Sequence, residues 1–263
     1  MIYIIYSALL ISFFLVLIRK WEINPNVSIP WAVLMTVLGV SILFLSEKIL
    51  PDLSDFFRLL ISTIVPVIIS FLTIVYLFLR DPERTPPQKN NVILSPADGK
   101  VIYINEINKG DFPIAIKGKN KIPLSDFTGE DFIPDRGIHI GIAMSFIHVH
   151  VNRSPIDGKI SKIKKIPGEF NSLKHINSLL ENERVFTQIN SKNLKVGIVQ
   201  IASRLIRRIE SYKKENDNVE IGDRIGIIKF GSQVDLLIDN PDIKIKINIG
   251  DEVKAGTSVL AEY

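Results

Sequence analysis

The sequence predicts a mainly β protein, in which a sandwich-like or barrel-like domain with one or two short helices follows an N-terminal α-helical membrane segment. Two observations support this fold class. The first 79 residues contain long stretches without any charged residue. From Val92 onward the chain consists mostly of short runs rich in Ile and Val, separated by turn residues, which is the pattern of β-strands.

The uncharged stretches cover residues 2–18, 29–46 and 59–79. As a helix, the third would be about 31 Å long at 1.5 Å per residue, which matches the thickness of a bilayer core. A transmembrane helix tolerates a proline such as Pro66. The second stretch is close to the lower length limit, so we expect two or three membrane helices within residues 1–79. A cleaved signal peptide is the alternative for the first stretch, but that stretch has no basic region before it.

The positive charges that flank these stretches predict the orientation of the protein. Arg19 and Lys20 follow the first stretch, and a Lys-rich domain follows the third. The positive-inside rule then places the first loop and the C-terminal domain in the cytoplasm, with the chain anchored in the cell membrane.

A polar, proline-containing connector at residues 80–91 leads to the domain at residues 92–263. Apolar residues alternate with polar ones in 158–166 and 243–249, which predicts strands with one buried face. We expect helices at about 171–182 and 202–210. SPADGKV (95–101) recurs as SPIDGKI (154–160), and each copy predicts an Asp-Gly turn that leads into a strand. The echo is either a repeat or two turns that merely resemble each other.

Composition limits the chemistry of the chain. The absence of cysteine excludes disulfides, thiolate nucleophiles and cysteine-based zinc sites. The net charge of +4 is modest, and clustered lysines at positions 162, 164, 165 and 174 suit a face turned toward anionic headgroups. The chain has no interleaved aromatic and basic patch, so we do not expect it to bind nucleic acid.

The candidate chemistry lies in short segments that follow one another along the chain: FLRDPER (78–84), SPADG (95–99), MS (144–145), HVHVNR (148–153), NER (182–184) and RIGIIKFGS (224–232). Their order and content resemble the phosphatidylserine decarboxylase family in its short, membrane-anchored form. The resemblance covers about residues 76–261. The last of the segments ends on the pair Gly231-Ser232. Without the resemblance, a glycine in a strand pattern would indicate only a bulge.

The resemblance implies a self-processing enzyme. The chain would cut itself between Gly231 and Ser232, which gives a β chain of residues 1–231 and an α chain that begins with a pyruvoyl group made from Ser232. Serine supplies the β-oxygen for an N-to-O acyl shift, and glycine leaves the carbonyl open to attack. The pyruvoyl ketone would form a Schiff base with the amine of a serine phospholipid, either phosphatidylserine or an archaeal analogue. Loss of CO2 would give the ethanolamine lipid without an external cofactor or a metal.

The resemblance also assigns roles to individual side chains. His150 would transfer protons. Asp98 would orient or polarise the maturation machinery, although an ordinary Asp-Gly turn also explains an aspartate there. His148 shares a strand face with His150 by alternation. The candidates for contact with the substrate are Arg153, His148, Lys229 and Arg184, and Arg184 has a structural ion pair as its alternative. The family usually has Arg where this chain has Gln233, and a homodimer is expected from the family.

Two other classes of protein explain part of the sequence. A non-enzymatic membrane adaptor with a β-sandwich domain accounts for the apolar stretches and the last hairpin, but not for the Gly-Ser pair. A histidine-centred metalloprotein would use His139, His148 and His150, because a His-x-His pair on a strand can supply two zinc ligands. No third ligand stands out in the sequence.

Overall fold

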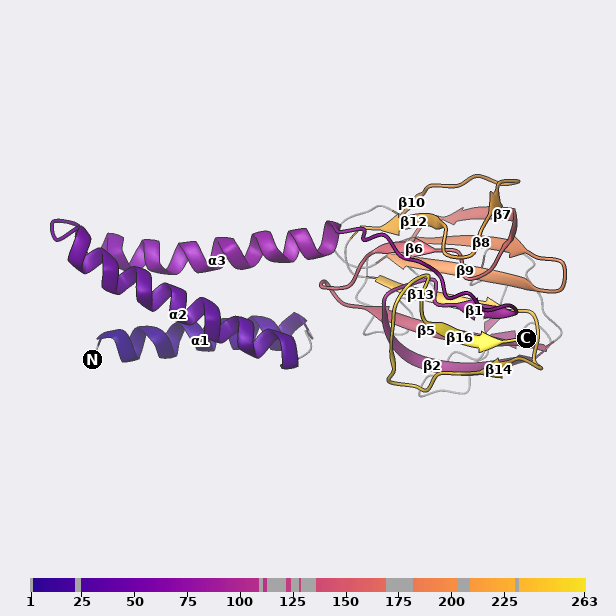
Figure 1. The fold of residues 1–263 in the computed structure, drawn as a ribbon, viewed down its shortest axis with the longest axis horizontal. Helices are drawn as coiled ribbons and strands as arrows, with labels where there is room; N and C mark the ends of the chain where they lie inside the picture. The colour runs from indigo at the N-terminus through magenta and orange to yellow at the C-terminus, as the bar shows by residue number, and fades with distance from the viewer. Residues whose placement is uncertain are drawn as a thin grey trace. The chain divides into compact units, whose positions relative to one another are not determined.

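The structure is a computed structural model, and it describes residues 2–21, 25–108, 111–112, 122–123, 128, 136–168, 182–202, 209–229 and 232–263. The chain forms two compact units, residues 1–79 with 145–147, and residues 80–144 with 148–263. Helices lie in the first unit and strands in the second (Figure 1), so the predicted fold class is confirmed. The helices expected at 171–182 and 202–210 fall largely outside the described residues, and residues 202, 209 and 210 belong to strands.

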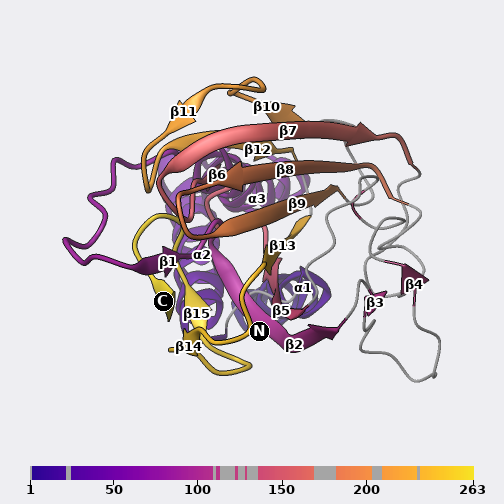
Figure 2. The ribbon, with the colours of Figure 1, turned by 90° about the vertical axis from the view of Figure 1, so that its right-hand side faces the viewer.

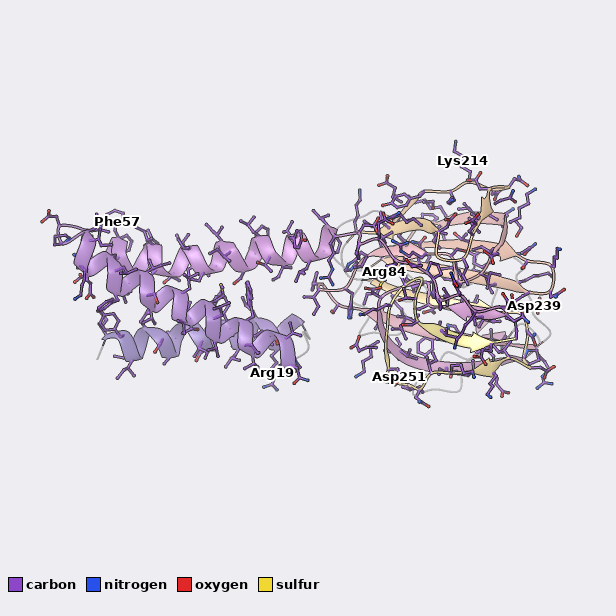
Figure 3. All side chains as sticks on the ribbon, in the orientation of Figure 1. Arg19, Phe57, Arg84, Lys214, Asp239 and Asp251 are labelled. Atoms are coloured by element: carbon purple, nitrogen blue, oxygen red, sulfur yellow. The ribbon has the colours of Figure 1, made fainter. Side chains whose placement is uncertain are left out.

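The first unit consists of α1 (Ile2–Trp21), α2 (Pro25–Ile49) and α3 (Asp55–Leu79). Each of the three is long and apolar enough to cross a membrane. Their outer surfaces carry large apolar side chains that no other part of this unit covers, among them Leu9, Leu34 and Phe71. The charged side chains lie toward the helix ends, as the labelled Arg19 does in Figure 3. These features indicate that the chain associates with a membrane.

A glycine allows the three helices to pack closely. A Cβ atom at Gly39 of α2 would lie 2.7 Å from Leu10 Cδ2 of α1 and 2.9 Å from the backbone oxygen of Ser62 in α3. Small residues let transmembrane helices approach in this way. The indole N–H of Trp31 also donates to the hydroxyl of Ser70, 3.3 Å away, which joins α2 to α3 by a polar contact.

The described residues of the second unit form sixteen strands in three sheets. The largest sheet has the order β11-β7-β8-β9-β13-β5-β2-β3-β4, with β15 also paired to β2, and it is visibly curled in Figure 2. Its strands are β2 (Gly99–Asn108), β3 (Asp111–Phe112), β4 (Ile122–Pro123), β5 (Arg136–Met144), β7 (Gly158–Ile166), β8 (Arg184–Asn190), β9 (Lys195–Ala202), β11 (Asn218–Val219), β13 (Ser232–Ile238) and β15 (Glu252–Val253). The two small sheets are β1-β16-β14, made of Val92–Leu94, Val259–Glu262 and Lys244–Ile245, and β10-β12-β6, made of Ile209–Ser211, Arg224–Ile228 and Val151–Arg153.

The core lies on one face of the large sheet. Leu236 at the centre of β13 stands opposite Ile140 of β5 and Ile198 of β9, and all three side chains are completely buried. This antiparallel pairing continues along the whole of β13, which has a neighbour on each side. Because successive side chains alternate between faces, the residues between these apolar ones lie on the opposite face.

The SPADG and SPIDG segments form a true structural repeat. The backbone N–H of Leu94 donates to Pro155 O, and that of Arg153 donates to Pro96 O, both at 2.9 Å. Each copy therefore hydrogen-bonds to the proline of the other. The alternative that the two turns merely resemble each other does not account for this reciprocal pairing.

Each copy of the repeat also binds a second turn. Asp98 Oδ1 accepts the N–H of Ala255 at 2.8 Å, and Asp157 Oδ1 accepts the N–H of Ile221 at 2.7 Å. The next residue in each of these turns is a glycine with positive φ, +70° in one and +88° in the other. Left-handed backbone favours glycine there, so the match extends from the aspartates to the loops that face them.

Candidate active site

The proposed cleavage position lies where the chain passes from one sheet to another. β12 ends at Ile228 in the small sheet beside β6, and β13 begins at Ser232 in the centre of the large sheet. Ser232 stands opposite Met144 of β5 and Ala202 of β9. Gly231 lies outside the described residues. The backbone on the serine side of the 231–232 link is therefore held between two strands.

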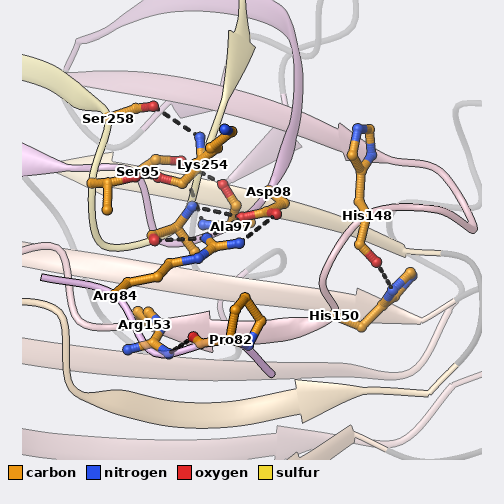
Figure 4. A network of polar contacts seen from close by, with 12 residues as sticks. Pro82, Arg84, Ser95, Ala97, Asp98, His148, His150, Arg153, Lys254 and Ser258 are labelled. Atoms are coloured by element: carbon orange, nitrogen blue, oxygen red, sulfur yellow. Dashed lines mark hydrogen bonds and ion pairs between the residues drawn. The ribbon is translucent and has the colours of Figure 1, made fainter. Parts of the chain in front are cut away.

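His150 is completely buried just before β6. Its Nδ1 lies 2.8 Å from the backbone carbonyl of His148 (Figure 4). A carbonyl can only accept, so Nδ1 carries the proton and the lone pair is on Nε2. Burial lowers the pKa of His150 from 6.5 to about 4, a change that the hydrogen bond to the carbonyl opposes. The imidazole is therefore neutral near pH 7 and able to accept a proton.

His148 is partly exposed and joins the segment before β6 to the C-terminal part of the chain. Its Nε2 lies 3.3 Å from Glu252 Oε2 on β15. Burial lowers the pKa of His148, while the carboxylates of Glu252 and Asp98 act to raise it. The prediction that His148 and His150 share a face of a strand is wrong, because both residues precede β6 (Val151–Arg153). Their side chains also have different surroundings, since His148 faces a carboxylate and His150 is buried.

Asp98 is buried and bound on several sides. Arg84 of the connector approaches both carboxylate oxygens, at 2.5 and 2.8 Å (Figure 4). The Ala255 N–H donates to Oδ1. The carboxylate also favours the charged forms of His148 and His150 through its negative charge. Its contact with a backbone N–H belongs to the repeat, because Asp157 makes the same contact, whereas Arg84 is particular to Asp98.

Arg153 holds the connector in the structure. Its guanidinium donates to Gly222 O at 3.0 Å, to Pro82 O at 3.0 Å and to Asp81 Oδ1 at 3.1 Å, and the side chain is 4% exposed. On the neighbouring strand Arg224 binds Asp81 at 2.5 Å and Glu83 at 2.6 Å. We call Asp81, Glu83, Arg153 and Arg224 the connector clamp. Substrate binding by Arg153 stays a prediction, and the clamp already uses much of its donor capacity.

The other two cations predicted to contact substrate lie in separate places. Lys229 follows β12 and is partly exposed, and its Nζ is 3.0 Å from Glu210 Oε2. Arg184 begins β8, is buried, and donates to Asn182 O at 3.2 Å, while burial lowers its pKa. In the sequence, Lys229 is three positions before Ser232. Arg184 stands opposite Ile201 of β9, the residue before Ala202.

The sequence reasoning missed two polar groups beside the cleavage position. One is a buried pair of amides, Asn152 and Gln200, in which Gln200 Nε2 donates to Asn152 Oδ1 at 2.7 Å. Asn152 lies within the segment HVHVNR (148–153) that carries His150, and this position in the sequence could have identified it. The sequence could not identify Gln200, because a polar residue within an apolar strand is also common at protein surfaces.

The other missed group surrounds Gln233, the residue after the cleavage position. Gln233 Nε2 donates to Asp235 Oδ1 at 2.7 Å and to the hydroxyl of Tyr103 at 2.6 Å. Tyr103 donates in turn to Asp235 Oδ2 at 2.7 Å, and His139 Nε2 lies 2.9 Å from that oxygen. Burial and the charge of Asp235 raise the pKa of Tyr103. His139 therefore belongs to this group, and not to the segment of His148 and His150.

The grouping of histidines that a metalloprotein would need has no counterpart among the residues that the structure describes. No set of three or more His, Cys, Asp or Glu side chains within that part of the chain is arranged to hold a metal ion. His139 contacts Asp235, His148 contacts Glu252, and His150 contacts a backbone carbonyl.

Comparison with known proteins agrees with this arrangement. The family model described as phosphatidylserine decarboxylase matches residues 71–261. A protein of Desulfotalea psychrophila named phosphatidylserine decarboxylase proenzyme is 36% identical over 188 residues, 70% of this chain and 77% of the relative. Proteins of the same name from Pelodictyon phaeoclathratiforme and Chlorobium luteolum are 34% and 37% identical over 71% and 74% of this chain, and over 77% and 81% of their own lengths.

These matches confirm the family that the sequence segments predicted, and they reject the non-enzymatic adaptor. The match to the family model spans most of the strand unit, including both copies of the repeat and the 231–232 link. The chain belongs to the phosphatidylserine decarboxylase family and is a decarboxylating enzyme, a carboxy-lyase.

Proposed function

We propose that this chain is the precursor of a pyruvoyl-dependent decarboxylase, which cuts itself between Gly231 and Ser232. Its substrate is a serine phospholipid, phosphatidylserine or an archaeal analogue, and its products are the ethanolamine phospholipid and CO2. The names of the relatives support both the substrate class and a precursor form. The observation that carries the proposal is the position of the 231–232 link between two sheets.

The strands on either side of the link suit a cut at this place. After cleavage β12 stays paired with β6 and β10, and β13 stays paired with β5 and β9 from Ser232 to Ile238. Residues 244–262 add further pairs with the rest of the chain, through β15 on β2 and β16 on β1. A group formed at residue 232 would therefore remain at the end of a central strand, which fits a prosthetic group made from the chain itself.

The cut follows from serine chemistry. Ser232 Oγ attacks the carbonyl carbon of Gly231 and forms a C–O bond, the C–N bond then breaks, and the hydroxyl proton passes to the freed amine. Removal of the α-proton of Ser232 then breaks its Cβ–O bond and releases Gly231 as a carboxylate. The dehydroalanine that remains takes up water and loses ammonia, which leaves a ketone. His150 suits both proton removals, because its imidazole is buried, neutral and oriented with its lone pair on Nε2.

The pyruvoyl group supplies a ketone that captures the substrate amine and accepts the electron pair left by CO2. The chain supplies the protons: we assign to His150 the return of a proton to the carbon that lost CO2. Asp98 supports this role through its charge, which favours the protonated imidazole. His148, Lys229, Arg153 and Arg184 are the proposed contacts for the substrate's charged groups.

A membrane anchor would keep the enzyme close to a lipid substrate. We propose that residues 1–79 span the bilayer and that the domain 92–263 lies on the cytoplasmic side, with residues 80–91 as the connector between them. Arg19 and Lys20 in the last turn of α1, and Arg80 and Arg84 after α3, support this orientation. A homodimer is proposed from the family resemblance alone.

Mass spectrometry of the full-length protein, purified in detergent, tests the proposal. The wild type should yield residues 232–263 as a fragment whose first residue is lighter than serine by one ammonia, and it should release CO2 from phosphatidylserine vesicles. Ser232→Ala should stay intact and inactive. Ser161→Ala, a matched change at an exposed strand serine, should behave as the wild type. An active wild-type chain with an unbroken 231–232 link would overturn the proposal.

A further inference from the structure

Asn152 and Gln200 form a buried bridge between two sheets. Asn152 is on β6 of a small sheet and Gln200 is on β9 of the large one, and their side-chain amides are 2.7 Å apart. The exposed fractions of the two residues are 0% and 1%. Both amides are thus removed from water, where each polar atom needs a partner to offset the loss of solvation.

The side chains of Asn152 and His150 lie on the same side of the segment that leads into β6. Val149 and Val151 pack against Ile227 in a small apolar cluster. Because side chains alternate along an extended chain, His150 and Asn152 lie on the other side. The contact from Gln200 to Asn152 shows that this side faces β9 of the large sheet.

The other end of the bridge lies close to the start of β13. Gln200 is two positions before Ala202, and Ala202 is the register partner of Ser232. Gln200 itself stands opposite Val234, on the same strand as Ser232. The amide bridge therefore connects the segment that carries His150 with β9, the strand that pairs with β13.

One donor of this bridge has no acceptor within the described part of the chain. Asn152 Nδ2 is fully buried and no described acceptor lies within hydrogen-bonding distance of it. Gln200 holds the oxygen of the same amide, so the orientation of the Nδ2 donor is fixed. A buried donor without a partner costs about 1–3 kcal/mol. A donor kept in place at that cost is the type of group that stabilises a negative charge formed during a reaction.

We infer that Asn152 Nδ2 donates a hydrogen bond to the carbonyl oxygen of residue 231 while Ser232 attacks that carbonyl, and that Gln200 is the positioning residue for this donor. The inference rests on the proposed self-cleavage. As the C–O bond forms, the carbonyl π electrons move to the oxygen, and the donor stabilises the resulting charge. The electrons return when the C–N bond breaks, and the nitrogen takes the proton that the hydroxyl lost.

Asn152→Asp separates this role from a structural one. An aspartate keeps an oxygen for the N–H of Gln200, but it replaces the Nδ2 donor by an acceptor. We expect self-cleavage to slow about 100-fold or more, which is the usual effect of losing one such donor. The measurement is the rate at which residues 232–263 appear in full-length protein synthesised in a cell-free system with lipid vesicles.

The pH dependence of the variant provides a second readout. When the carboxyl at position 152 takes up a proton, it regains an O–H donor. The ratio of the Asn152→Asp rate to the wild-type rate should therefore rise as the pH falls from 7.5 toward about 5, while a merely structural defect would leave the ratio constant.

Asn190→Asp is the matched control. Asn190 Oδ1 accepts from Gln188 Nε2 at 2.8 Å, so the substitution makes the same chemical change in another Gln-Asn pair of the large sheet. Its cleavage rate should equal that of the wild type. Gln200→Leu, which frees the Asn152 amide, should slow cleavage less than Asn152→Asp does.

Folding is checked in the uncleaved Ser232→Ala protein, where the melting temperatures with and without Asn152→Asp are compared. If the aspartate lowers the melting temperature strongly, Asn152→Ala decides, since it removes the donor without adding a charge. A folded Asn152 variant that cleaves at the wild-type rate overturns the inference and leaves self-cleavage intact. Failure of the wild type itself to cleave at 231–232 overturns the proposed function instead.

Discussion

Asp98 and Asp157 occupy matching positions in the two halves of the strand unit, and each carboxylate accepts one backbone N–H from the turn that faces it. Asp98 is buried and also binds Arg84, whereas Asp157 is exposed. The contact with the backbone is therefore a feature of the repeated fold. The contact with Arg84 links the connector to the copy of the repeat whose carboxylate acts on the two histidines.

This relationship predicts unequal effects of the same substitution. Asp98→Asn keeps an oxygen for the Ala255 N–H but leaves the mostly buried guanidinium of Arg84 without its carboxylate, so it should lower the free energy of unfolding by about 3 kcal/mol. Asp157→Asn keeps its one contact and should cost less than about 1 kcal/mol. Thermal unfolding of both variants in the uncleaved Ser232→Ala protein makes the comparison. Equal losses would show that Arg84 contributes little.

The lowered pKa of His150 predicts an unusual pH dependence. Self-cleavage needs the neutral imidazole, so its rate should fall only when the pH approaches the pKa of about 4, well below the ordinary 6.5. The rate of appearance of residues 232–263 between pH 4 and 8 gives the acid limb directly. His150→Gln should slow cleavage about 100-fold or more throughout this range. A wild-type acid limb centred at or above pH 6.5 would contradict a buried, neutral base.

The connector clamp predicts a local opening. Asp81→Asn removes the carboxylate shared by Arg153 and Arg224, which should destabilise the unit by about 1–2 kcal/mol and free residues 80–91. Limited proteolysis should then cut the connector several-fold faster than in the wild type. Asp239→Asn is the control, since the carboxylate of Asp239 lies at a long distance of 3.8 Å from the exposed Lys195 Nζ. An unchanged rate in the connector would show that the clamp does not hold it.

The group around Gln233 predicts a pH-sensitive variant. Gln233→Glu would place a second carboxylate against Asp235 in a buried space where Tyr103 supplies a single hydroxyl proton. The new carboxyl should have a raised pKa in the folded state and lower the free energy of unfolding by about 3 kcal/mol at pH 7.5. That loss should disappear as the pH falls below the raised pKa, because the protonated carboxyl can donate again. Gln188→Glu, on β8, should show little change, and a pH-independent loss at position 233 would point to packing instead of charge.

Most of the architecture could be predicted from local patterns. Uncharged stretches and alternating apolar residues report burial directly, so the helical segment and the strand-rich domain were expected. The repeat was visible as two similar heptapeptides, but the turns that bind Asp98 and Asp157 differ too much in sequence to be matched by eye. Their equivalence depends on backbone geometry, in the form of two glycines with positive φ and two reciprocal hydrogen bonds.

The site was predictable in its residue types and less so in their contacts. The segments identified His150 and Ser232, which stay predicted as the proton carrier and the scissile residue. Arg153 was expected to be available to substrate because arginine suits phosphate, yet its donors reach the connector, 71 and 72 positions earlier in the sequence. Gln200 was not identified, because its partner Asn152 is in another sheet and no local pattern connects residues so far apart.

The position of β13 has a consequence for the protein after the proposed cut. The C-terminal piece, residues 232–263, would cross the middle of one sheet and contribute strands to another. Refolding of a denatured mature molecule would require two separate polypeptides to meet, so recovery should depend on concentration and compete with aggregation. The uncut precursor would refold as a single chain. Cleavage would therefore be irreversible in practice, since the mature protein could not return to that state.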